Sequence, residues 1–168
     1  MQNELLWLAM LLANFFLIIL AYKLFGKWGL IIWIPISVIV ANIQVIQTIQ
    51  LFGLVATLGN IVYATSFLVT DILSENYGKK EAQKAVWIGF FSLISMTLLM
   101  NLALVFKPLA GDDFATITHN ATSTIFKLMP RIAIASLAAY LLSQRHDVWA
   151  YHFWRKRFSK DNQIWLRN

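Results

Sequence analysis

Two carboxylates interrupt an otherwise apolar stretch of the sequence, SFLVTDILSENYGKKEAQKA. Asp71 and Glu75 are spaced i, i+4, so on a helix their side chains lie on one face. An ionised side chain at the centre of a bilayer costs about 2.5–3.5 kcal/mol on insertion scales. Either both acids lie at a helix end, where they reach water and pair with Lys79, or at least Asp71 lines a polar cavity and binds a ligand or a proton. Residue types alone leave both interpretations open.

A further charged group, Arg131, follows Pro130 in an apolar run. Its guanidinium stays charged in a protein, so a buried Arg131 requires a partner. The alternative is an arginine at the membrane surface, on a helix that begins at Pro130, because proline suits the first helical position. Asn42 and Gln44 offer amide donors and acceptors, either to a polar solute or to a hydrogen bond between helices.

The composition is that of an integral membrane protein. Of 168 residues, 59% are hydrophobic and 13% are charged, whereas soluble domains have about 45–50% apolar and about 25% charged residues. The chain has no cysteine and its three histidines lack HExxH spacing, so we expect no metal and no cofactor. It has no GxxxxGK[ST] loop and no GxSxG motif either, which argues against an ATPase or hydrolase and against an enzyme.

Five apolar stretches approach the length of about 20 residues that a spanning helix requires. Four cover residues 5–22, 30–47, 52–73 and 86–106, and the fifth starts near residue 121 and contains Pro130 and Arg131. The expected fold is all-α, a polytopic helical bundle of about five transmembrane helices in one transmembrane domain, residues 1–168. Within it we expect an extra N-terminal helix and loop at 1–29, core helices at 30–148, and a basic cytoplasmic segment at 149–168 that leads to a helix absent from this chain.

The basic residues predict the orientation of these helices. Lys23 and Lys27 form one group, a second group begins at Lys79, and a third begins at Arg145. If successive helices alternate in direction, all three groups fall on the same side, which the positive-inside rule makes cytoplasmic. The N-terminus and the segments TIQLFG and KPLAGDDFATITHN then face out. We interpret the net charge of +6 as this topology signal and expect no nucleic-acid partner.

Two motifs in the same order resemble the queuosine precursor transporter family, also called the vitamin uptake transporter family. They read T-D-x-x-x-E-x-x-G and R-I-x-x-A-S-x-x-A-Y, and fall at Thr70, Asp71, Glu75 and Gly78, and at Arg131, Ile132, Ala135, Ser136, Ala139 and Tyr140. The resemblance covers residues 36–168. It implies a multi-pass importer in the inner (plasma) membrane that takes up 7-deazaguanines, chiefly 7-cyano-7-deazaguanine, for the queuosine modification of tRNA. Family members continue into two more hydrophobic helices, so we expect this chain to be a partial form.

The resemblance also implies a substrate site. A deazaguanine presents ring N–H and NH₂ donors that one carboxylate can accept together, and a carbonyl oxygen that needs a donor. The residues expected to bind it are Asp71, Glu75, Arg131, Asn42, Gln44 and Tyr140, with a stacking face from Trp33, Phe67 or Tyr140. Proton coupling through Asp71 or Glu75 and facilitated diffusion both fit these residues.

Two other functions are compatible with the sequence. One is a substrate-capturing subunit that docks on a separate ATPase, as in energy-coupling-factor vitamin transporters. The other is a non-transporting membrane scaffold in which Asp71 and Arg131 pair between helices. The expected partners are a small-molecule deazaguanine and the lipid bilayer, and association into a homo-oligomer is left open.

Overall fold

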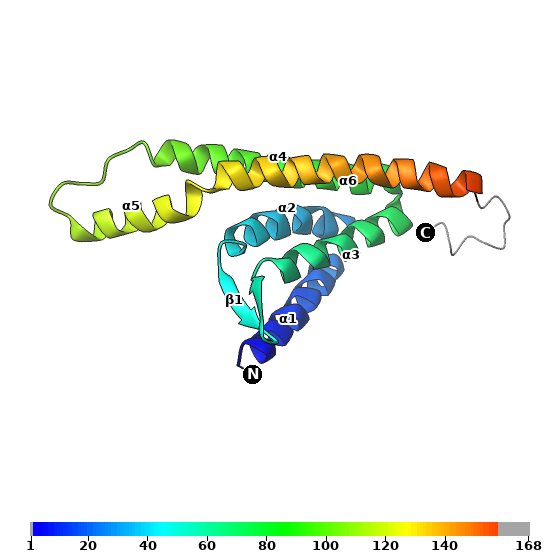
Figure 1. The fold of residues 1–168 in the computed structure, drawn as a ribbon, viewed down its shortest axis with the longest axis horizontal. Helices are drawn as coiled ribbons and strands as arrows, with labels where there is room; N and C mark the ends of the chain where they lie inside the picture. The colour runs from blue at the N-terminus through cyan, green and yellow to red at the C-terminus, as the bar shows by residue number, and fades with distance from the viewer. Residues whose placement is uncertain (1, 158–168) are drawn as a thin grey trace. The chain divides into compact units, whose positions relative to one another are not determined.

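The described chain consists of helices and one β-hairpin. The computed structural model describes the backbone of residues 2–157 and the side chains of residues 2–143. The chain divides into two compact units, Met1–Ala133 and Ile134–Asn168, and each is described by itself. The elements are α1 (Gln2–Phe25), α2 (Lys27–Gln44), β1 (Thr48–Leu51), β2 (Leu54–Thr57), α3 (Asn60–Tyr77), α4 (Lys79–Ala103), α5 (Asp113–Phe126) and α6 (Met129–Arg157) (Figure 1).

Several of these elements are built to cross a membrane. Four segments of the described chain are long and apolar enough for this by length and composition: Gln2–Phe25, Lys27–Gln44, Lys79–Ala103 and Asp113–Ser143. The last combines α5 with the first part of α6. Helix α3 is not among them, because threonine, serine, asparagine and acidic residues punctuate its 18 residues. The predicted polytopic helical fold is confirmed.

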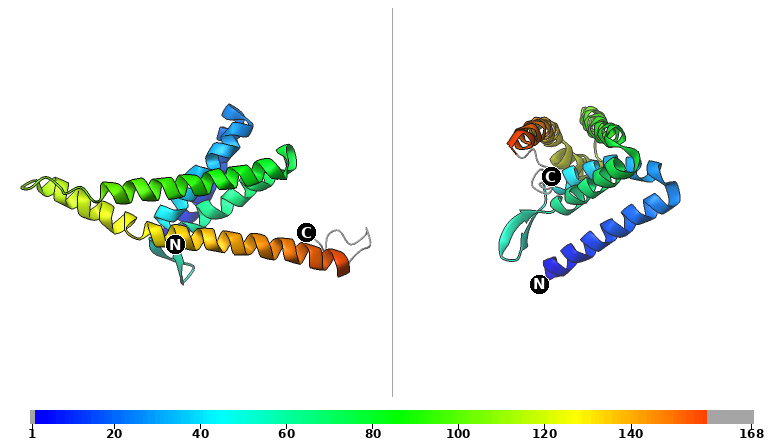
Figure 2. Two further views of the ribbon diagram at one scale, coloured as in Figure 1. Left: turned by 90° about the horizontal axis from the view of Figure 1, so that it is seen from above. Right: turned by 90° about the vertical axis from the view of Figure 1, so that its right-hand side faces the viewer.

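The core of the first unit lies where α2 packs against α1, α3 and α4 (Figure 2). Its most completely buried side chains include Leu30 and Ile34 of α2, Val69 and Leu73 of α3, and Leu93 of α4. These residues recur at intervals of three or four within each helix, which gives each helix one apolar stripe toward its neighbours. Most remaining apolar side chains of α1 and α4 are exposed in the protein alone, as expected for surfaces that face lipid.

The third predicted span begins later than the sequence indicated. Residues assigned to its start lie in the hairpin, where Leu51 pairs with Leu54 and Thr48 pairs with Thr57. The turn between them has φ of 50° at Phe52 and 79° at Gly53, the positive values of a two-residue hairpin turn that matches the strand twist. The predicted start at residue 52 was wrong because a short apolar run fits a strand as well as a helix.

The fifth predicted span contains a break. Helix α5 ends at Phe126 and α6 begins at Met129, so Lys127 and Leu128 separate two helices. Pro130 lies in the first turn of α6, where a missing backbone N–H costs least. The expected continuous helix from residue 121 through Arg131 was wrong at this point.

One end of the α1–α4 group collects basic and aromatic residues. The Nζ atom of Lys27 lies 2.7 Å from Oε2 of Glu81 and 5.6 Å from the centre of the Tyr77 ring. The hydroxyl oxygens of Tyr22 and Tyr77 are 3.3 Å apart. These contacts join the α1–α2 turn to the α3–α4 turn, and we call this end, which also carries Lys23 and Lys79–Lys84, the basic end.

The hairpin closes the opposite end. The side-chain amide of Asn3 donates to the carbonyl oxygen of Gln50 at 3.1 Å, and the backbone N–H of Phe52 donates to Oε1 of Glu4 at 3.1 Å. We call this end, where α1 and α3 begin and α2 ends, the hairpin end. The first two basic groups of the sequence therefore share one end of the unit, as the alternating directions require.

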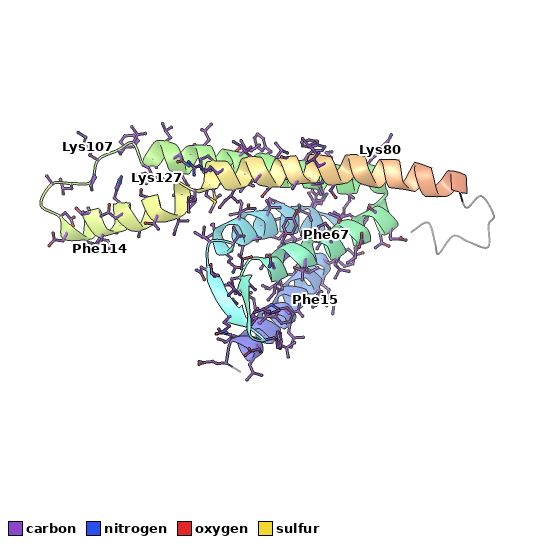
Figure 3. All side chains as sticks on the ribbon, viewed as in Figure 1. Phe15, Phe67, Lys80, Lys107, Phe114 and Lys127 are labelled. Carbon is purple, nitrogen blue, oxygen red and sulfur yellow. The ribbon has the colours of Figure 1, made fainter. Side chains whose placement is uncertain are left out.

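This arrangement predicts that the basic end and the α4–α5 loop lie on opposite sides of the membrane. The exposed residues Lys80 and Lys107 allow this topology to be measured (Figure 3). Each is replaced by cysteine in this cysteine-free chain. On intact cells, an impermeant thiol reagent should label Lys107→Cys and leave Lys80→Cys unlabelled until the cells are opened, because the positive-inside rule predicts that the basic end is cytoplasmic. Labelling of Lys80→Cys alone would reverse the topology.

Candidate substrate-binding residues

Helix α3 has a packed face and an open face. The packed face carries Ile61, Val62, Thr65, Ser66, Val69 and Leu73. The open face, on the other side of the helix, carries a row at i+4 spacing formed by Tyr63, Phe67, Asp71 and Glu75, all exposed. The rings of Tyr63 and Phe67 meet edge to face with centroids 5.4 Å apart. Two aromatic rings followed by two carboxylates thus form a single stripe along α3, which we call the α3 stripe.

The carboxylates of this stripe are not used for local structure. Among the described residues, neither Asp71 nor Glu75 makes an ion pair or a hydrogen bond. The nearby acid that does make an ion pair is Glu81, which binds Lys27. The described structure therefore holds no Asp71–Lys79 pair, which is the contact that the helix-end interpretation requires.

Buried polar groups lie near the hairpin end, on α2 and on α4. Asn42 is 5% exposed and Thr97 is 7% exposed. Oε1 of Gln44 and Oγ1 of Thr97 are buried and have no hydrogen-bond partner in the described chain. A buried polar atom without a partner is costly, and water or a polar solute can supply the hydrogen bond that is missing.

Helix register places these groups at one level. A Cβ at Gly89 of α4 would lie 3.0 Å from Ile34 of α2, and both helices run from the basic end. Asn42 lies eight residues beyond Ile34, and Thr97 eight beyond Gly89, which is about 12 Å along each helix. Asn42, Gln44 and Thr97 therefore form a polar layer near the hairpin end, which we call the α2–α4 layer.

Arg131 lies on the hairpin-end side as well. Its side chain is exposed in the first turn of α6, five residues after Phe126, whose carbonyl oxygen binds Asn101 of α4. Ala85 of α4 and Asp71 of α3 are equally far in sequence from the turn at Gly78, so both lie at about the same level of the two helices. Asn101 is sixteen residues beyond Ala85, which is about 24 Å farther along α4. The described structure therefore brings Arg131 toward the α2–α4 layer and does not bring it together with Asp71.

The three expected stacking residues have different surroundings. Trp33 is buried in the core of the first unit, and its indole N–H has no partner in the described chain. Phe67 is 57% exposed on the α3 stripe, one turn before Asp71 (Figure 3). Tyr140 is half-buried on α6 in the second unit. Phe67 is the aromatic residue whose position beside a free carboxylate suits a planar ligand.

Sequence reasoning missed two polar residues of α4, Thr97 and Asn101. They lie on the predicted span at residues 86–106, and they are four residues apart, so they share one face. A pair of polar residues on one face of an apolar helix is the signal that could have found them. Asn101 donates to the backbone carbonyl of Thr97 at 2.9 Å and to that of Phe126 at 3.0 Å.

Comparison with known proteins identifies the chain's relatives. Residues 57–168 match the family model described as "Putative vitamin uptake transporter". The chain belongs to this family. It is 45% identical, across all 168 of its residues and 72% of the other protein, to the "Probable queuosine precursor transporter" of Bacillus subtilis. It is 30% identical over 98 residues, 58% of this chain and 38% of the relative, to the "Probable queuosine precursor transporter" of Haemophilus influenzae.

Family membership fixes the general class of the protein. It is a multi-pass cell-membrane protein of a transporter family, whose partners are a small-molecule substrate and the lipid bilayer. The match with the Bacillus subtilis protein includes residues 1–56, which precede the region of the family model. The N-terminal helix α1 is therefore shared with that relative. No solved structure matches the chain significantly.

Proposed function

We propose that this protein imports queuosine precursors of the 7-deazaguanine class across the cell membrane and leaves them chemically unchanged. The observation that carries the proposal is the 45% identity, over the whole chain, with a protein named as a queuosine precursor transporter. The expected motifs around Asp71 and Arg131 lie within the region that matches the family model. The α3 stripe supplies the chemistry that such a substrate needs.

Recognition begins at Asp71. A deazaguanine carries two adjacent donors, the ring N–H and the exocyclic NH₂, and a carboxylate can accept both at once. Asp71 has no competing partner among the described residues, and Phe67 at i−4 offers a ring face on which the bicyclic base stacks. A deazaguanine lacks the N7 acceptor of guanine, so selection by an arginine fork to O6 and N7 is not available.

During transport the substrate meets two polar regions, one after the other. The α2–α4 layer and Arg131 lie toward the hairpin end and offer amide, hydroxyl and guanidinium groups to the substrate carbonyl. Asp71 and Glu75 lie toward the basic end and accept its donors. A substrate that moves from the hairpin end to the basic end exchanges one set of hydrogen bonds for the other. Its polar groups are therefore not buried in the apolar bundle without hydrogen-bond partners. Unpartnered Gln44 and Thr97 support the first region, and the free carboxylates support the second.

Uptake by the purified protein tests the proposal. Reconstituted alone in vesicles, it should accumulate or equilibrate labelled 7-cyano-7-deazaguanine, and unlabelled 7-deazaguanines should compete better than guanine. Expression in cells that cannot synthesise the precursor should restore queuosine in their tRNA when the precursor is supplied. Uptake that requires a copurifying ATPase would instead indicate a substrate-capturing subunit, and binding of vitamins without binding of deazaguanines would overturn the substrate class.

A further inference from the structure

The backbone at the α5–α6 break has a defect that Pro130 creates. In a continuous α-helix, the carbonyl oxygen of residue i accepts from the N–H of residue i+4. The carbonyl of Phe126 would therefore accept from residue 130, which is proline and has no N–H. In lipid or in a protein interior, a carbonyl without a donor is costly because no bulk water replaces the bond.

A side chain from another helix supplies the absent donor. The Nδ2 atom of Asn101, near the end of α4, lies 3.0 Å from the carbonyl oxygen of Phe126. The same NH₂ group donates to the carbonyl of Thr97, one turn back on its own helix, at 2.9 Å. An amide NH₂ has two N–H donors, so both bonds can form together. The second bond holds the half-buried Asn101 side chain in the orientation that the first one needs.

We propose that Asn101 is a positioning residue that replaces the hydrogen bond lost at Pro130 and thereby fixes the break between α5 and α6. The break in turn sets the first turn of α6, which carries Arg131 one residue after Pro130. Asparagine fits this role because it is short, uncharged and able to donate twice. The effect of Asn101 on transport rests on the proposed function, whereas the role of Asn101 in fixing the break does not.

A double-mutant cycle tests the role in structure. Asn101→Leu removes the donor, so the variant should show a lower melting temperature in detergent and faster hydrogen exchange at the amides of residues 127–129, 131 and 132. Pro130→Ala provides a backbone N–H for the Phe126 carbonyl, so in that background Asn101→Leu should have much less effect on both measurements. Ser92→Ala is the matched control, because among the described residues Ser92 bonds only to the Ile88 carbonyl of its own helix. It should change neither measurement at the break.

The outcomes separate this inference from the proposed function. Equal losses from Asn101→Leu in the Pro130 and Pro130→Ala backgrounds would overturn the positioning role, as would failure to fold in both. Folding only in the Pro130→Ala background would support it. In uptake, Asn101→Leu should raise the apparent KM for the deazaguanine about tenfold, the effect of losing one hydrogen bond to a charged group such as Arg131. If the unaltered protein shows no deazaguanine uptake, the proposed function fails while the exchange data still decide the role of Asn101.

Discussion

Asp71→Asn should bind a 7-deazaguanine about ten- to hundredfold more weakly than the unaltered protein. The substitution keeps the size of the side chain and one acceptor oxygen, but it removes the charge and the second acceptor. Hydrogen bonds to a charged group contribute about 1.5–3 kcal/mol, and each 1.4 kcal/mol is about tenfold in affinity. Direct binding to the purified protein, followed by uptake at equal expression, measures the loss.

Lys79→Gln is the matched control for this experiment. Lys79 is the first residue of α4, two residues beyond the end of α3, and is exposed. Its replacement removes a nearby charge and leaves the residues of the α3 stripe unchanged. An exposed ion pair contributes about 0–1 kcal/mol, and no such pair between Lys79 and an acid exists in the described chain. The control should retain near-normal binding. If both variants bind and transport like the unaltered protein, Asp71 does not hold the substrate.

Gly29→Ala should destabilise the first unit by about 3 kcal/mol, toward the upper part of the usual range for overpacking. Gly29 of α2 lies directly against the backbone of α1, and a Cβ there would overlap the backbone carbonyl of Ala21. A backbone carbonyl cannot rotate away as a side chain can, so the two helices have to separate. Separation would expose Leu30 and Ile34, which are fully buried beside it. Thermal unfolding in detergent and protease sensitivity measure the effect.

Gly89→Ala provides the comparison, because it adds the same methyl group to another helix contact. The added Cβ would meet side-chain methyl groups, at 3.0 Å from Ile34 and 3.3 Å from Val38, and these can shift by small rotations. Alanine also favours a helix over glycine by about 0.8–1.0 kcal/mol, which offsets the crowding. We expect its stability to stay within about 1 kcal/mol of the unaltered protein. Equal losses at Gly29 and Gly89 would contradict the close approach of α1 and α2.

The sequence by itself determined the class of the protein and the approximate positions of its apolar helices. Apolar runs of membrane length are a local property, because each residue in lipid must satisfy its backbone within its own helix. The placement of lysines in alternate turns is local too, and the structure confirms that Lys27 and the Lys79–Lys84 segment share one end. Asp71 and Glu75 were predictable as one face of a helix for the same reason, since i+4 spacing alone decides it.

Tertiary structure decided the features that depend on contacts between distant residues. The hairpin occupies the predicted start of the third span, because Leu51 and Leu54 pair across two β-strands. Hydropathy does not reveal this pairing. At the break before α6, the carbonyl oxygen of Phe126 accepts a hydrogen bond from Asn101, twenty-five positions away, and no window of sequence around Pro130 contains that donor. The separation of Asp71 from Arg131 follows from the direction and length of α4. Residue types select which groups can bind a solute, but only the packing of helices determines which of those groups one solute can reach at the same time.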